Sequence, residues 1–96
     1  MPKYEKIESA DLTDALAGLP GWELVDGKLH REFQFKDFSE AIGFMTRAAM
    51  DCHLLDHHPE WSNVYNRVTI DLVTHFTGGI TNLDIDLASR FNAYFD

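Results

Sequence analysis

The chain has 96 residues, the size of one small domain with a single hydrophobic core. Hydrophobic residues make up 45% and charged residues 25%, a balance that excludes a disordered chain. The formal net charge of −8 argues against direct binding to nucleic acid, because affinity for phosphates depends on Lys and Arg. We therefore expect one domain over residues 1–96 whose ligand is a small molecule or another protein.

The composition also indicates in which compartment the protein lies and whether it associates with copies of itself. Cys52 is the only cysteine, so no internal disulfide can form, which suits the cytoplasm. The opening MPKYEKIESA has no apolar signal core, and no stretch approaches the roughly 20 apolar residues that span a bilayer. We expect a cytoplasmic protein without a membrane partner. Because so small a domain is only marginally stable alone, we also expect it to associate with copies of itself.

The first predicted elements are a short helix and a β-hairpin. Ser9 is expected to cap a helix over ADLTDALAGL that ends near Gly18. The stretch WELVDGKLHREFQF is centred on Asp26-Gly27, a dipeptide typical of two-residue hairpin turns. It predicts two antiparallel strands within residues 22–35.

Residues 37–56 predict a long helix. Asp37 or Ser39 can cap it, and its apolar residues recur at three- and four-residue steps. Pro59 disfavours helical geometry at the preceding residue, so the helix must end at or before His58.

The last third of the chain predicts further strands and a final helix. NVYNRVTIDLVTHF alternates as one strand, or as two that join at a bend near Asn66. Thr81 with Asp84 three residues later approximates a capping box before an apolar stripe. Strand pairs between helices predict an α+β two-layer sandwich, in which a four-stranded antiparallel sheet carries the helices on one face.

Histidines gather at the ends of these elements. His53, His57 and His58 lie within six positions, and His75 follows at the end of the late strand. Imidazole transfers protons in both directions near neutrality. A pocket with two or three histidines therefore suits a dehydration, in which one group protonates a leaving hydroxyl and another removes a proton. Trp61 could add an aromatic surface for a planar ring.

Other interpretations of these residues stay open at this point. Adjacent histidines in a proline-containing loop are often only solvated. His53 and His57 are four apart, so on a helix they would share a face and could hold a metal with His75 or Asp56. No Cys-x-x-Cys or His-Glu-x-x-His frame supports that metal site. Asp84 is explained by capping and the helix dipole, with a second role near the histidines as an alternative.

The combined pattern resembles the pterin-4a-carbinolamine dehydratase family, also known as a dimerisation cofactor of a homeodomain transcription factor. HLLDHHPEWSNVY, the later THF and Asp84 keep every spacing of the family signature. FKDFSEAIGFMTR and DIDLASRF are also similar to the family. The resemblance extends over the chain from about Trp22.

The resemblance implies dehydration of 4a-hydroxytetrahydropterin to quinonoid dihydropterin, which recycles the cofactor of aromatic amino acid hydroxylases. It implies no metal and no organic cofactor. His57 and His75 would be the general acid–base pair, and His58 would bind and orient the pterin. Three further residues match substrate-contacting segments of the family: Asp56, Thr74 and Phe76.

The resemblance also implies an assembly and an alternative function. Family members dimerise through strand pairing and often form tetramers through the long helix, so a homodimer or homotetramer is expected. Animal members also stabilise transcription-factor dimers, which makes a protein-binding module without significant catalysis the alternative. One departure stands out, because His53 occupies a position that is usually Glu. A carboxylate there could orient a catalytic histidine, a task that Asp84 could perform instead.

Overall fold

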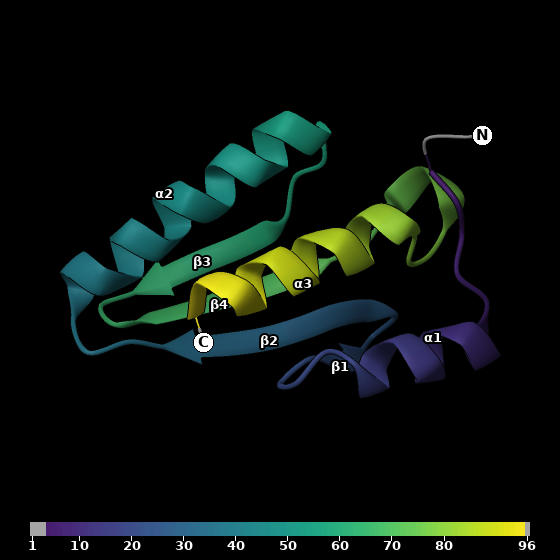
Figure 1. Ribbon diagram of the computed structural model, residues 1–96, viewed down its shortest axis with the longest axis horizontal. Helices are drawn as coiled ribbons and strands as arrows, with labels where there is room; N and C mark the ends of the chain where they lie inside the picture. The colour runs from purple at the N-terminus through teal and green to yellow at the C-terminus, as the bar shows by residue number, and fades with distance from the viewer. Residues whose placement is uncertain (1–3, 96) are drawn as a thin grey trace.

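The computed structural model describes residues 4–95 and has the predicted α+β architecture. The elements follow one another as α1 (Ser9–Ala17), β1 (Glu23–Val25), β2 (Lys28–Gln34), α2 (Phe38–Leu55), β3 (Glu60–Val64), β4 (Arg67–Leu72), the 3₁₀ turn η1 (His75–Thr77) and α3 (Asn82–Phe95). The strands form one antiparallel sheet in the order β1-β2-β4-β3. The helices α2 and α3 lie side by side over one face of this sheet, and α1 lies beside β1 (Figure 1).

The hairpin between β1 and β2 forms as its sequence predicts. Val25 pairs with Lys28, which leaves Asp26 and Gly27 as the two turn residues. Both have positive φ angles, 51° and 78°, as the twist-compatible hairpin turn requires. Asp and Gly are among the residues that adopt positive φ angles with the least steric strain. The Asp26-Gly27 dipeptide therefore sets the register in which β1 pairs with β2.

The core lies between the sheet and the two long helices. Phe33 of β2 has no exposed surface, and its ring centroid lies 4.8 Å from that of Phe44 on α2. The strand β4 alternates as predicted, with a fully buried residue at every second position: Val68, Ile70 and Leu72. This alternation leaves the opposite face of the sheet to polar side chains, among them His30 and Asp71.

Helix boundaries mostly follow the predicted caps. The side chain of Asp37 accepts a hydrogen bond from the backbone N–H of Glu40 at 2.9 Å, so Asp37 caps α2. The prediction for α1 was wrong in detail, because Ser9 is the first helical residue and Glu8 occupies the cap position without a side-chain cap bond. Both residues precede the same apolar stripe, so the periodicity alone cannot separate them.

The late strand region divides into two strands. Tyr65 has a φ angle of 52° and forms, with Asn66, the turn between β3 and β4. The first strand begins at Glu60, so the segment after the histidine pair runs directly into the sheet. His75 lies beyond the end of β4, in η1. Among the residues that the structure describes, no helix is both long enough and apolar enough to cross a membrane.

Candidate active site

The end of α2 places His57 in the interior. Asp56 adopts the left-handed conformation (φ 52°, ψ 46°), which ends the helix. The backbone N–H of His57 donates to the carbonyl of Cys52 at 3.0 Å, and that of Asp56 donates to the carbonyl of His53 at 3.1 Å. These two bonds form a Schellman motif, with Asp in the position that usually holds Gly or Asn. The motif turns the chain sharply, and the His57 side chain is only 8% exposed.

His57 pairs with a buried carboxylate. Its Nε2 lies 2.5 Å from Oδ1 of Asp84, which has no exposed surface. An ionised carboxylate only accepts hydrogen bonds, so it holds a proton on Nε2 of His57. Among residues 4–95, Nδ1 of His57 has no hydrogen-bond partner. The pair therefore has the chemistry of a carboxylate-oriented base, in which the acid sets the imidazole tautomer and stabilises positive charge on the ring.

Asp84 is held by its own hydrogen bonds at the start of α3. Its Oδ2 accepts from Oγ1 of Thr74 and from the backbone N–H of Thr81, both at 2.9 Å. The second bond is half of the predicted capping box. Asp84 therefore has both of the roles considered for it, because one carboxylate oxygen caps α3 while the other contacts His57.

His75 lies at the surface with a different carboxylate. Its Nε2 is 3.0 Å from Oε2 of Glu60, and the side chain is 72% exposed. The other oxygen of Glu60 accepts from Nζ of Lys28 at 2.6 Å. Hydrogen bonds from Lys28, and secondarily from His75, hold the pKa of Glu60 below its ordinary value. Glu60 therefore stays an anion next to His75 in mildly acidic solution.

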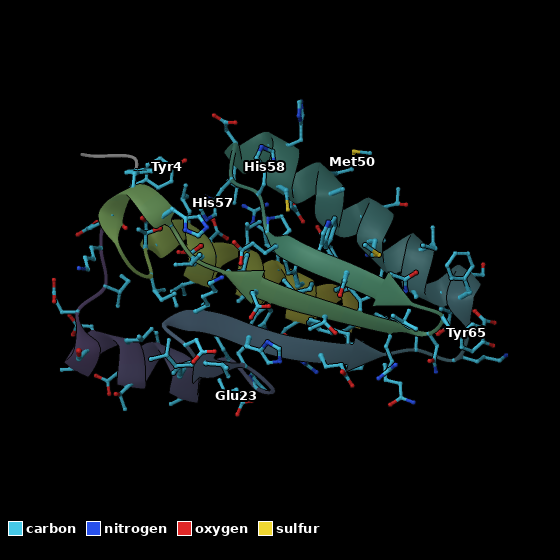
Figure 2. The ribbon with its side chains drawn as sticks, turned by 180° about the vertical axis from the view of Figure 1, so that it is seen from behind. Tyr4, Glu23, Met50, His57, His58 and Tyr65 are labelled. Atoms are coloured by element: carbon cyan, nitrogen blue, oxygen red, sulfur yellow. The ribbon has the colours of Figure 1, made fainter. Side chains whose placement is uncertain are left out.

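A cavity of about 260 Å³ joins His57, His58 and His75. Figure 2 shows His57 and His58 toward the same end of the molecule as Tyr4. The walls of the cavity come from the N-terminal segment, the loop after α2 and the connection from β4 to α3: Tyr4, Asp56, His57, His58, Val73, Thr74, His75 and Phe76. The cavity thus brings together six of the sequence-predicted site residues, including all three histidines of the signature. His58 is exposed at its rim, whereas His57 is buried.

Two predicted residues lie elsewhere. Trp61 is on β3 and packs, partly buried, against the hydrophobic core, outside the walls of this cavity. His53 is exposed on the last turn of α2 and is likewise not a cavity residue. Within residues 4–95 no group of three or more His, Cys, Asp or Glu side chains is arranged to hold a metal ion.

Two cavity-related residues were missed by sequence reasoning. Glu60 lies inside the segment DHHPEW, but its contact with His75 depends on how β3 begins beside η1. Tyr4 precedes every predicted element, and no periodicity or motif marks it. For Glu60 the signal was its place two residues after the histidine pair. For Tyr4 the sequence carries no signal.

A second cleft lies away from the histidines. It is larger, about 430 Å³, and lies between the end of β2, α2 and the C-terminal turn of α3, with Lys36, Arg47 and Tyr94 among its walls. It contains no histidine and no buried acid. Size alone would favour this cleft, yet the three histidines of the signature all line the smaller cavity. We therefore take the cavity that contains His57 as the candidate active site.

The chain is similar to known proteins over nearly its whole length. Residues 5–94 match the family described as pterin 4 alpha carbinolamine dehydratase. A protein of Solibacter usitatus, provisionally named a pterin-4-alpha-carbinolamine dehydratase, is 51% identical over 88 residues, which cover 92% of this chain and 93% of that protein. A Prochlorococcus marinus protein of the same provisional name is 48% identical over 98% of both chains.

A solved structure is similar throughout. The crystal structure of a transcriptional coactivator/pterin dehydratase from Brucella melitensis superposes with a TM-score of 0.92 at 47% sequence identity, covering 96% of this chain and all of that one. The family match and the structural match both extend over nearly the whole chain. The chain therefore belongs to the pterin-4a-carbinolamine dehydratase family.

Proposed function

We propose that this protein is a 4a-hydroxytetrahydropterin dehydratase, a hydro-lyase that releases water from the 4a-carbinolamine to form quinonoid dihydropterin. The observation that carries the proposal is the pair of His57 with the buried Asp84, since His57 lines a cavity that is also lined by His58 and His75. A dehydration needs one proton delivered and one removed, and two separate histidine–carboxylate pairs at one cavity supply both functions. No metal and no organic cofactor takes part in this scheme.

The two pairs differ in burial, and this difference suggests their roles. His57 accepts the proton from the pterin ring nitrogen at Nδ1, because Asp84 keeps the proton on Nε2 and stabilises the imidazolium that forms. His75 donates a proton to the 4a-hydroxyl, which leaves as water. Its exposed ring exchanges protons with solvent, so it regains its proton for the next turnover.

Four further cavity residues bind the substrate. His58 at the rim orients the pterin through its ring nitrogens, while Asp56, Thr74 and Phe76 contact it. Thr74 also donates to Asp84, so it links the substrate contact to the acid. In the cell the product is returned to the tetrahydropterin cofactor, and the enzyme would serve that recycling. A protein-binding role without catalysis is less well supported, because it has no use for two histidine–carboxylate pairs at a cavity.

The test is dehydratase turnover of enzymatically generated 4a-hydroxytetrahydropterin, followed by stopped-flow absorbance. His57→Ala and His75→Ala are each expected to lower kcat by about two to four orders of magnitude, the usual contribution of general acid–base catalysis. His30→Ala is the matched control, because His30 also pairs with a carboxylate, Asp71 at 2.8 Å, but lies on the open face of the sheet. A wild-type protein that acts no faster than buffer would refute the proposal.

We also propose that the protein forms a homodimer or a homotetramer. The strand β3 is an edge strand of the sheet, so its outer hydrogen-bonding groups can pair with a second copy. Four exposed apolar side chains lie along α2: Phe38, Ile42, Met50 and Leu54. Met50 projects away from the sheet (Figure 2). Light scattering coupled to size exclusion measures the assembly, and a monomer at micromolar concentration would contradict it.

A further inference from the structure

The segment before α1 is attached to the connection that leads into α3. The backbone N–H of Ile7 donates to the carbonyl of Ile80 at 2.8 Å, and that of Asn82 donates to the carbonyl of Glu5 at 3.0 Å. A second hydrogen bond joins the same two residues, because Oδ1 of Asn82 accepts from the backbone N–H of Glu5 at 2.7 Å. In Figure 1 this segment runs beside the start of α3. These bonds hold the residue that precedes them, Tyr4, at the active-site end of the molecule.

Tyr4 contacts the cavity through its ring. The ring centroid lies 4.6 Å from that of Phe76, edge to face at 89°, and 5.8 Å from that of His57 at 62°. Its hydroxyl donates to the carbonyl of Asp56 at 3.3 Å. Tyr4 is thus a wall of the cavity that contains the catalytic histidine (Figure 2).

This aromatic pair has surface left for a ligand. Tyr4 is half-buried, and Phe76 is 73% exposed although it is a large apolar side chain. A purely structural contact would bury the Phe76 ring, whereas here much of its surface faces solvent at the cavity. The planar pyrimidine half of a pterin is a flat π-system that could cover such a surface, since aromatic rings favour stacked or edge-to-face contacts.

We propose that Tyr4 is a substrate-binding residue, which forms with Phe76 the aromatic wall against which the pterin ring packs. The inference rests on the proposed function, because it takes the pterin as the occupant of the cavity. Tyr4 lies just before the residues that match the family, so the N-terminal segment contributes one of the two rings of this wall. The contact binds the ring and leaves the proton transfers to the histidines.

Steady-state kinetics distinguish a role of Tyr4 in binding the pterin from a role in positioning His57. Tyr4→Ala is expected to raise KM about tenfold, the scale of one aromatic contact with its buried area, while kcat stays within about threefold. Tyr4→Phe keeps the ring and loses only the hydroxyl, so its KM should rise far less. Tyr65→Ala is the matched control, because Tyr65 is an exposed tyrosine in the β3–β4 turn at the opposite end of the molecule. A role confined to holding His57 would instead lower kcat and leave KM unchanged.

Direct binding gives a second measurement that does not depend on turnover. Oxidised pterin is fluorescent and cannot be dehydrated, so its titration reports affinity alone. Tyr4→Ala, and Tyr4→Leu as a variant that retains bulk without a ring, should both weaken this binding relative to Tyr65→Ala. If the wild type binds pterin and both Tyr4 variants bind equally well, the inference is overturned while the proposed function stands. If the wild type neither binds nor dehydrates a pterin, the proposed function itself fails.

Discussion

Replacing Asp84 with Asn tests the central feature of the site. Asp84→Asn keeps the shape of the side chain but converts one acceptor oxygen into an N–H₂ donor. Thr74 and the Thr81 N–H both donate to Oδ2, so the amide oxygen is expected to stay there and the amide nitrogen to face His57. Nε2 of His57 must then accept, which moves the ring proton to Nδ1. The imidazole loses its basic nitrogen on the substrate side.

The magnitude follows from what the change removes. An imidazole in the wrong tautomer loses general-base catalysis, so kcat should fall by about 10²- to 10⁴-fold, or about 3–5 kcal/mol of transition-state stabilisation. Folding stability should fall by about 2–3 kcal/mol, the cost of losing a buried hydrogen bond to a charged group. KM should change little, because the Asp84 side chain contacts His57, Thr74 and Thr81 rather than the cavity surface.

Three measurements check this expectation: stopped-flow dehydratase rates, the urea midpoint, and the ¹⁵N shifts of the His57 ring, which report the tautomer. Asp71→Asn is the matched control, since it changes a His–carboxylate pair of 2.8 Å that lies outside the cavity. A folded Asp84→Asn protein with kcat within threefold of the wild type, or with the proton still on Nε2, would refute the reasoning.

Two further predictions concern Glu60 and Cys52. Glu60→Gln should lower kcat by only about three- to tenfold, because the pair with His75 is solvent-screened. Since the pKa of Glu60 is lowered, its ion pairs persist above that pKa and are lost as pH falls through it, so a kcat–pH profile should show the two proteins converging in acid. Burial raises the pKa of the Cys52 thiol to about 11, so folded protein should resist iodoacetamide at pH 8. The unfolded thiol ionises first, so stability should fall by about 2–3 kcal/mol between pH 9 and pH 11 relative to Cys52→Ala in urea titrations.

The features that were predictable from sequence depend on local chemistry. The Asp26-Gly27 turn, the Asp37 cap and the stop before Pro59 each follow from the conformational preferences of a few neighbouring residues. The alternation in β4 follows from one buried face of a sheet. These local signals agree with one another, and so the element order and the two-layer architecture could be inferred without a structure.

Contacts between segments that are far apart in the sequence were not predictable in the same way. Lys28 reaches Glu60 from another strand, and both strands pair with β4 between them. Tyr4 reaches the cavity only because the N-terminal segment bonds to residues near α3. Such pairings depend on the relative positions of segments far apart in the chain, which single-sequence periodicity does not report.

The position of His53 illustrates how one backbone residue decides between two interpretations. The four-residue spacing of His53 and His57 would place both on one helix face, but Asp56 leaves the helix in the left-handed conformation. The chain then turns His57 inward while His53 stays exposed on the last turn. A carboxylate at position 53 is also not required to hold His57, because Asp84 already does so from α3 at 2.5 Å. The buried His57–Asp84 pair therefore does not depend on the residue at position 53, and His53 lies at the surface of the last turn of α2.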